Sequence, residues 1–146
     1  MALTRSANAT WSGDLLSGTG TVSLATGLLS ESPTSWSART EAAEGKTSPE
    51  ELLAAAHASC FSMALSNILA KDGFVAERLD VTSDVTGDKR EAGWTVLSSH
   101  LTVSGRVPGI DQDGFTDAAN RAKDGCPISR ALVNNVELSV DATLEA

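Results

Sequence analysis

Two cysteines, Cys60 and Cys126, are the residues of this sequence whose side chains could carry out redox chemistry. They lie 66 positions apart, so only the fold can bring their sulfur atoms together. A thiol in the middle of a buried helix, as expected for Cys60, titrates high unless a cation or hydrogen-bond donor stabilises its thiolate. Cys126 precedes Pro127 at the start of an expected helical turn, where the helix dipole favours negative sulfur. The residue types alone leave two interpretations open, a redox pair or two small core side chains.

His57 lies three residues before Cys60, so the two side chains should share one face of a helix. It could serve the sulfur as a base or a hydrogen-bond donor, but residue type favours a histidine hydrogen-bonded within the core. A zinc site is disfavoured, because there is no CxxC pair and His100 is the one other histidine. The Gly-x-Ser-x-Gly elbow of serine hydrolases and a glycine-rich phosphate loop are also missing.

The stretch 48–71 predicts one long helix that carries the first cysteine. Ser48 suits the N-cap, Glu51 follows three residues later as in a capping box, and Pro49 falls at the first helical position. Gly73 can take the left-handed conformation that ends a helix. Because there is almost no charge between the caps, this helix should be buried by more than one layer. Its polar interruptions and N-terminal carboxylates argue against a membrane span.

The remaining segments predict an α+β fold. Alternating residues bounded by turn signals predict strands over 9–16, 20–24, 34–40, 78–86, 94–107 and 136–144. The polar segment 88–93 is the expected hairpin connection, and helices are expected over 112–123 and 126–132. The order of strands, long helix, hairpin, helix and strand favours mainly antiparallel pairing.

Length and charge narrow the class of protein. A chain of 146 residues predicts one domain, residues 1–146, large enough for a core without disulfides. A formal net charge of −8 argues against binding a nucleic-acid backbone. No apolar run follows the first residues, so no signal peptide is expected and the cytoplasm is the default compartment. Cysteines in that reducing environment are more often reactive, metal-binding or inert than joined in a structural disulfide.

Two motifs resemble those of a known family. The stretch TSPEELLAAAHASCFSMALS, residues 47–66, strongly resembles the first cysteine motif of the osmotically inducible protein C (OsmC) family. The stretch GCPIS, residues 125–129, matches the second. The sequence His57-Ala58-Ser59-Cys60 is similar to the OsmC branch rather than the sister organic hydroperoxide resistance (Ohr) branch, which usually has Gly-Tyr there. Shorter similarities cover essentially the whole chain, at 11–14, 34–40, 107–111 and the final strand.

The resemblance implies a fold and an activity. The fold would be OsmC-like, with mainly antiparallel sheets wrapped around a long central helix in an intertwined homodimer. The activity would be that of a thiol-dependent peroxidase that needs no metal, flavin or other cofactor and prefers organic hydroperoxides. Cys60 would attack the peroxide and become a sulfenic acid, and Cys126 would resolve it as a Cys60–Cys126 disulfide. An external dithiol, a dihydrolipoyl group in the Ohr branch, would reduce that disulfide.

The resemblance also assigns an arginine and a glutamate to the site. Glu50 matches the glutamate, and Arg39 is the best match for the arginine. Arg39 would lower the pKa of the thiol and polarise the peroxide, while Glu50 would orient the guanidinium through a bidentate pair. Residue types alone favour a surface strand arginine and leave Glu50 equally able to act only on the helix dipole. Glu51 is interpreted as the capping residue.

The spacing of Glu50 from Cys60 carries a further expectation. Ten positions on a straight helix correspond to about 15 Å, too far for one small site. Either the helix bends, or Glu50 serves the cysteine of a second subunit, and we favour the second. Candidates for an apolar lining are Trp36, Phe61 and Ile128. Two alternatives to a peroxidase remain open, a non-enzymatic redox-sensing or thiol-binding stress protein and a structural dimer with inert cysteines.

Overall fold

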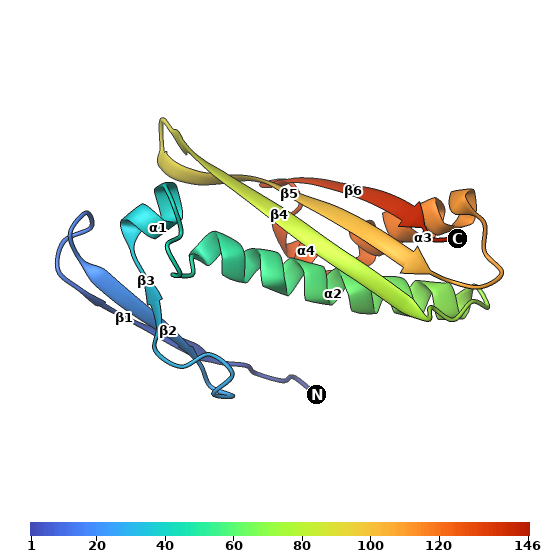
Figure 1. Ribbon diagram of the computed structural model, residues 1–146, viewed down its shortest axis with the longest axis horizontal. Coiled ribbons are helices and arrows are strands. Elements are labelled where there is room, and N and C mark those ends of the chain that lie inside the picture. Colours follow the sequence, from blue (N-terminus) through green and yellow to red (C-terminus); the bar gives the residue numbers. More distant parts are fainter. The chain divides into compact units, whose positions relative to one another are not determined.

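Six strands and four helices make up the fold, and the computed structural model describes all residues from 1 to 146. They form two compact units, residues 1–52 and residues 53–146. The elements follow in the order β1 (Ala7–Ser12), β2 (Thr19–Leu24), β3 (Ser32–Thr34), α1 (Trp36–Thr40), α2 (Pro49–Lys71), β4 (Arg78–Arg90), β5 (Gly93–Arg106), α3 (Gln112–Gly125), α4 (Pro127–Leu132) and β6 (Glu137–Leu144) (Figure 1).

The first unit holds an antiparallel sheet in the order β1-β2-β3, followed by α1 and the beginning of α2. Every residue of β1 is exposed, and Ala38 is the one buried apolar residue of the unit. Larger apolar side chains such as Trp11 and Leu16 are 44% and 77% exposed. This unit therefore has almost no hydrophobic core of its own within one chain.

The strand predicted over 9–16 is too long. It ends at Ser12 because the Asp14 carboxylate accepts the backbone N–H groups of Leu16 and Ser17, both at 2.9 Å. These two bonds close a turn of the kind that aspartate side chains often form.

The strand predicted over 34–40 is wrong for most of its length. Residues Trp36–Thr40 form the short helix α1, and Arg39 lies in its last turn rather than on a strand. The helix starts there because the Ser35 hydroxyl accepts the backbone N–H of Ala38 at 3.1 Å, as an N-cap does.

The long helix α2 is confirmed at both ends. The Ser48 hydroxyl accepts the N–H of Glu51 at 3.1 Å, which is the first half of the expected capping box. The Glu51 carboxylate instead accepts the hydroxyl of Thr47 at 2.6 Å. Gly73, at φ 90°, takes the left-handed conformation expected beyond the last turn.

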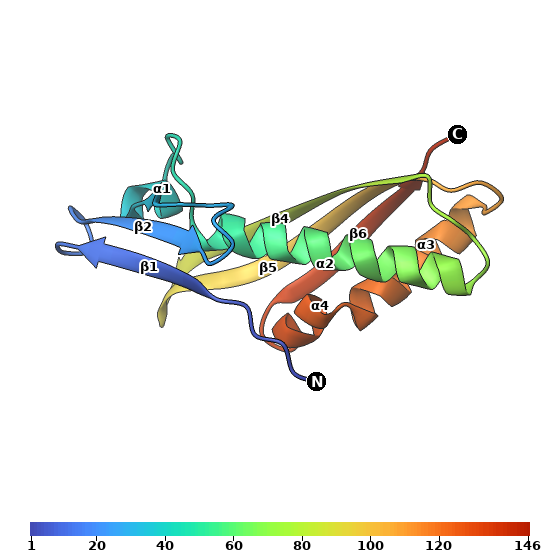
Figure 2. The ribbon, with the colours of Figure 1, turned by 90° about the horizontal axis from the view of Figure 1, so that it is seen from below.

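The second unit is a sheet in the order β4-β5-β6 with helices packed on one face (Figures 1 and 2). β4 and β5 form a long antiparallel hairpin, while β6 runs parallel to β5 because α3 and α4 carry the chain back between them. The segment 88–93, predicted as a loop, is mostly paired, since the hairpin ladder continues to Arg90 and Gly93. The α+β prediction with mainly antiparallel pairing is confirmed.

The core of this unit lies between the sheet and one stripe of α2. Buried residues of the helix recur every fourth position, at His57, Phe61, Leu65 and Leu69. They meet buried side chains of the sheet and of α3, namely Leu101, Val103, Phe115, Ala118, Ala119 and Ala122.

The opposite side of α2 lacks the cover predicted for it, and its exposed residues are mostly alanines and serines together with Met63 and Asn67. Only 22% of its most apolar window, with a mean hydropathy of 1.5, is buried, and Met63 is 64% exposed. By length and composition alone such a helix could cross a membrane, but core helices of water-soluble proteins meet the same criterion. The sheet and helices of the second unit therefore cover α2 on one side only.

Candidate functional site

The second unit brings the two cysteine side chains together. Both are free thiols, and the Cys126 thiol lies within hydrogen-bonding reach of the Cys60 sulfur. The backbone N–H of Ile128 also points at the Cys60 sulfur. Cys126 is fully buried, whereas Cys60 is partly exposed. A reagent can therefore reach Cys60 first, and Cys126 stands behind it.

Cys126 is placed by the junction of two helices. Its backbone N–H bonds to the carbonyl of Ala122 at 2.8 Å, which closes α3, and its own carbonyl accepts the N–H of Arg130 at 2.9 Å, which opens α4. Pro127 occupies the first position of α4, as the sequence predicts. The thiol is thus fixed where one helix ends and the next begins.

The surroundings of Cys60 oppose its ionisation. Burial raises the pKa of the Cys60 thiol, and the adjacent Cys126 thiol raises it further. The Ile128 N–H and the positive charge of Arg130 act in the opposite direction but do not reverse this pKa shift. A reactive thiolate at Cys60 therefore requires a positive charge or a donor beyond those of the second unit.

His57 is a core histidine, as its residue type predicted. Its ring is fully buried, with Nδ1 at 2.6 Å from the Ser99 hydroxyl and Nε2 at 2.8 Å from the Ser129 hydroxyl. Ser99 in turn lies 3.0 Å from the hydroxyl of Ser83. Burial lowers the pKa of His57, which keeps the ring neutral, with one nitrogen donating and the other accepting.

Sequence reasoning missed the two serines that hold this ring. Ser99 shares the inward face of β5 with Leu101 and Val103. The alternation of residues along this strand could therefore have predicted that Ser99 points into the core. Ser129 lies on α4, three residues after its N-cap residue Cys126, but nothing local in the sequence indicates its partner.

Arg39 and Glu50 are brought together in the first unit. The Arg39 Nε lies 2.9 and 3.1 Å from the two carboxylate oxygens of Glu50, and its Nη2 lies 2.9 Å from Oε1. Glu50 is nearly buried, with 10% of its side chain exposed, while Arg39 keeps 29%. The guanidinium carbon also lies 5.9 Å from the centre of the Trp36 ring. The predicted pairing is present, and it holds the guanidinium in one orientation.

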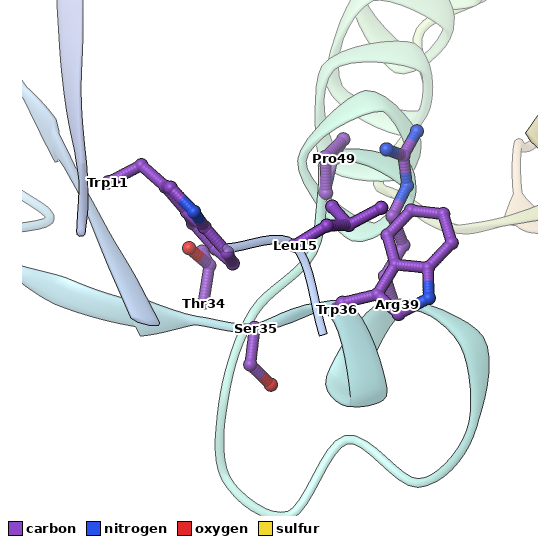
Figure 3. A pocket seen from close by; sticks show the side chains of 7 residues that line it. All are labelled: Trp11, Leu15, Thr34, Ser35, Trp36, Arg39 and Pro49. Atoms are coloured by element: carbon purple, nitrogen blue, oxygen red, sulfur yellow. The ribbon is translucent and has the colours of Figure 1, made fainter. Parts of the chain in front are cut away.

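This guanidinium lines a pocket of about 330 Å³ in the first unit. Figure 3 shows the side chains around it, which are mostly apolar: Trp11, Leu15, Thr34, Ser35, Trp36, Arg39 and Pro49. Of the expected lining residues, Trp36 lies in this pocket, whereas Phe61 is fully buried in the core of the second unit. The pocket can hold an apolar group beside one fixed positive charge.

The four predicted site residues therefore form two pairs, Cys60 with Cys126 and Arg39 with Glu50. Each pair belongs to a different unit. The helix α2 is continuous, and it carries Glu50 in its first turn and Cys60 ten residues later. Ten positions on a straight helix correspond to about 15 Å, and of a bend or a second subunit as the way to unite such positions the sequence favoured the second subunit.

The fold and the two thiols define an α+β protein with a neighbouring pair of reduced cysteines. Comparison with known proteins gives its family. The profile of the OsmC-like protein family matches residues 42–141. The chain is 41% identical to peroxiredoxin OsmC of Escherichia coli K12 over 146 residues, the full length of both proteins. It is 30% identical to organic hydroperoxide resistance protein OhrA of Bacillus subtilis over 105 residues, covering 70% of this chain and 72% of that one.

Solved structures agree on the fold. The crystal structure of the organic hydroperoxide resistance protein OhrB of Bacillus subtilis superposes with a TM-score of 0.75 at 24% identity, covering 94% of this chain and 98% of that one. The chain belongs to the OsmC-like family, as its two cysteine motifs predicted.

Proposed function

We propose that this chain is a thiol-dependent peroxidase that reduces organic hydroperoxides to alcohols. The Cys60 thiolate attacks the terminal peroxide oxygen, the O–O bond breaks, and the alkoxide leaves and takes up a proton as the alcohol. Cys60 is then a sulfenic acid. The Cys126 thiol attacks that sulfur, a Cys60–Cys126 disulfide forms, and the hydroxyl leaves as water. An external dithiol reduces the disulfide and is itself oxidised to a disulfide.

The observation that carries this proposal is the pair of reduced sulfur atoms, one partly exposed and the other buried against it. An accessible thiol beside a resolving thiol is the arrangement that a reversible thiol peroxidase needs. The names of the relatives, a peroxiredoxin and an organic hydroperoxide resistance protein, point to the same chemistry.

The remaining requirement is a positive charge at Cys60, and we assign it to Arg39 of a second chain. The neighbours of Cys60 in its own unit leave its pKa raised, and Arg39 is held ready by Glu50 in a different unit. A homodimer in which each site takes both cysteines from one chain and Arg39 and Glu50 from the other meets this requirement. The uncovered side of α2 and the coreless first unit both support dimerisation.

The pocket beside Arg39 supports an organic rather than an inorganic peroxide. An alkyl tail gains about 25 cal/mol for each Å² of apolar surface that it buries, a gain that hydrogen peroxide lacks. The Trp36 and Leu15 side chains offer such surface beside Arg39, and Trp11 lines the opposite side of the pocket. The reductant is a dithiol, for which a lipoyl protein is the candidate, and the setting is the cytoplasm. No nucleic acid and no membrane take part.

A thiol count tests this proposal. Reduced protein receives one equivalent of an alkyl hydroperoxide, and free thiols are measured with time. We expect fast loss of both thiols, loss of one in Cys126→Ser, and none in Cys60→Ser. Unchanged thiols in the wild-type protein would refute the peroxidase. Peroxide consumption in the presence of dihydrolipoamide then distinguishes the enzyme from the alternative, a redox-sensing or thiol-binding stress protein. An enzyme should continue to consume peroxide, whereas the alternative should stop after one turnover.

A further inference from the structure

The short helix α4 carries groups that surround the Cys60 sulfur, and Ile128 and Ser129 hold it against the rest of the fold. It follows directly on Cys126 and contains Ile128, whose backbone N–H points at Cys60. Six residues are too few for a helix to be stable by itself, so contacts with the rest of the fold must position α4. Ser129 is the one buried residue of this helix.

That buried residue is attached to α2 by a hydrogen bond. The Ser129 hydroxyl lies 2.8 Å from Nε2 of His57, and both side chains are excluded from solvent. His57 and Cys60 are three residues apart on α2, and Cys126 and Ser129 are three residues apart across the start of α4. The bond therefore joins the two helices one turn away from the two sulfur atoms.

The ring of His57 is itself held from the other side. Nδ1 is 2.6 Å from the hydroxyl of Ser99 on β5, and Ser99 bonds to Ser83 on β4. The chain of contacts thus runs from the sheet through α2 to α4. Burying these polar groups costs desolvation free energy. Aliphatic side chains at the same positions would avoid that cost if the residues served only to fill the core.

We infer that His57 is a positioning residue for the Cys60–Cys126 pair, which it serves by fixing α4 through Ser129. Closing the disulfide brings the sulfur atoms to about 2.05 Å in a narrow range of angles. Small displacements of reacting groups slow a reaction strongly, by up to about a hundredfold for about 1 Å. The His57–Ser129 bond acts chiefly on the resolving step, because closure needs the Cys126 sulfur in place. To the attack on the peroxide α4 contributes only the Ile128 N–H and the positive charge of Arg130 at the Cys60 sulfur.

The inference rests on the proposed peroxidase cycle, and single-turnover kinetics separate the two. One measurement follows the sulfenic acid, trapped with dimedone, and the other follows loss of both thiols as the disulfide closes. Ser129→Ala and Ser99→Ala form a matched pair, because each removes one buried hydroxyl from one nitrogen of the same ring. We expect Ser129→Ala to close the disulfide at least about tenfold more slowly and to slow sulfenic acid formation much less. Ser99→Ala should close within about threefold of wild type.

Substitution of the ring provides an independent comparison. A glutamine amide places a polar group near the position of Nε2, and an asparagine amide places one near Nδ1. His57→Gln should therefore keep the bond to Ser129 and close at nearly the wild-type rate, whereas His57→Asn should close as slowly as Ser129→Ala. Hydrogen exchange of the α4 amides, including Arg130 and Val133, should quicken in the slow variants and not in the fast ones.

The outcomes are distinct. If the wild-type protein loses no thiols, the proposed peroxidase fails. If the wild-type protein closes its disulfide and the Ser129→Ala and Ser99→Ala proteins close equally fast, the positioning role of His57 is wrong. Equal rates for His57→Gln and His57→Asn would overturn it as well, and this second pair decides the question if Ser129→Ala does not fold.

Discussion

Glu50 and Glu51 are neighbouring carboxylates in the first turn of α2, and their side chains have different partners. Glu50 is nearly buried, and both of its carboxylate oxygens accept hydrogen bonds from Arg39. Glu51 is exposed, and its carboxylate accepts a hydrogen bond from the Thr47 hydroxyl. Both lie equally close to the positive end of the helix dipole. Glu50 therefore differs from Glu51 in its burial and in its pair with Arg39.

The matched variants Glu50→Gln and Glu51→Gln exploit this difference. We expect Glu50→Gln to lower the rate of peroxide reduction at least about tenfold, because the guanidinium loses the charge that orients it. Glu51→Gln should stay within about twofold of wild type. Steady-state consumption of an alkyl hydroperoxide with a dithiol measures both. Equal losses would mean that the carboxylates act only through the helix dipole.

His57 gives the stability of the protein a defined pH dependence. Burial places its pKa in the folded state below the ordinary value of 6.5, so the unfolded chain binds more protons as pH falls. Stability from this residue is full above pH 6.5 and declines below it. One proton accounts for at most about 1.4 kcal/mol between pH 7.5 and 5.5.

Urea unfolding at those two pH values, at one fixed protein concentration, checks this. The decline should be smaller in His57→Gln, because an amide does not titrate. An equally steep decline in wild type and His57→Gln would assign the effect to other groups.

The partners of His57 also show what residue types can and cannot predict. A histidine in an apolar helix predicted a hydrogen-bonded core residue, because a buried ring must satisfy its nitrogens. The identity of the partners was out of reach, since Ser99 and Ser129 lie 42 and 72 positions away. The same holds for Cys60 and Cys126, whose approach only the packing of α2 against α4 decides.

At the scale of elements, local signals predicted α2 and failed for α1. The limits of α2 follow from Ser48 and Gly73, which act within a few residues of the helix they end. In the segment 34–40, apparent alternation favoured a strand, but the Ser35 side chain caps a helix instead. Whether the segment forms a strand or a helix depends on whether a neighbouring strand pairs with it. Only the short β3 (Ser32–Thr34) pairs with β2.

The packing of α3 on the sheet depends on the missing side chain of Gly105 in β5. A Cβ atom there would overlap the ring of Phe115, which lies fully buried on α3. We expect Gly105→Ala to lower the free energy of unfolding by about 1–3 kcal/mol, as overpacking does.

Gly125, at the end of α3, is the control for that substitution. A Cβ atom there meets nothing within 4 Å, so Gly125→Ala should be neutral or slightly stabilising. Urea denaturation at a fixed protein concentration compares both variants with wild type. Equal stability of the Gly105→Ala and wild-type proteins would show that α3 can shift away from the sheet without cost.

At the scale of the molecule, two surfaces of the chain lack packing partners that a second copy could supply. The first unit has one buried apolar residue, Ala38, and α2 leaves one side, which includes Met63, exposed. A three-stranded sheet needs a packed face to be stable, so one chain does not account for the order of this unit. The all-round apolar pattern of α2 already indicated additional cover, although the sequence could not say which surface supplies it.

A purified mixed dimer tests whether the second copy also completes the site. One chain carries Cys60→Ser and the other Glu50→Ala, with different affinity tags. If each site combines the cysteines of one chain with Glu50 of the other, one site of the mixed dimer is intact and the other has lost both groups. The mixed dimer should then show about half the wild-type peroxide turnover. Each parent homodimer carries its substitution at both sites, so both parents should reduce peroxide much more slowly than the mixed dimer.

The mirror combination supplies the control, because a dimer with both substitutions on one chain and a wild-type partner leaves each site with one lesion. Under the shared-site hypothesis it should be nearly inactive, despite having one unaltered chain. If instead each chain completes its own site, the expected results are reversed. The dimer with both substitutions on one chain should keep about half the wild-type activity, because its wild-type chain has an intact site. The dimer with one substitution on each chain should then be nearly inactive. Activity therefore reports which chain supplies Glu50, and with it the Arg39 guanidinium that Glu50 holds.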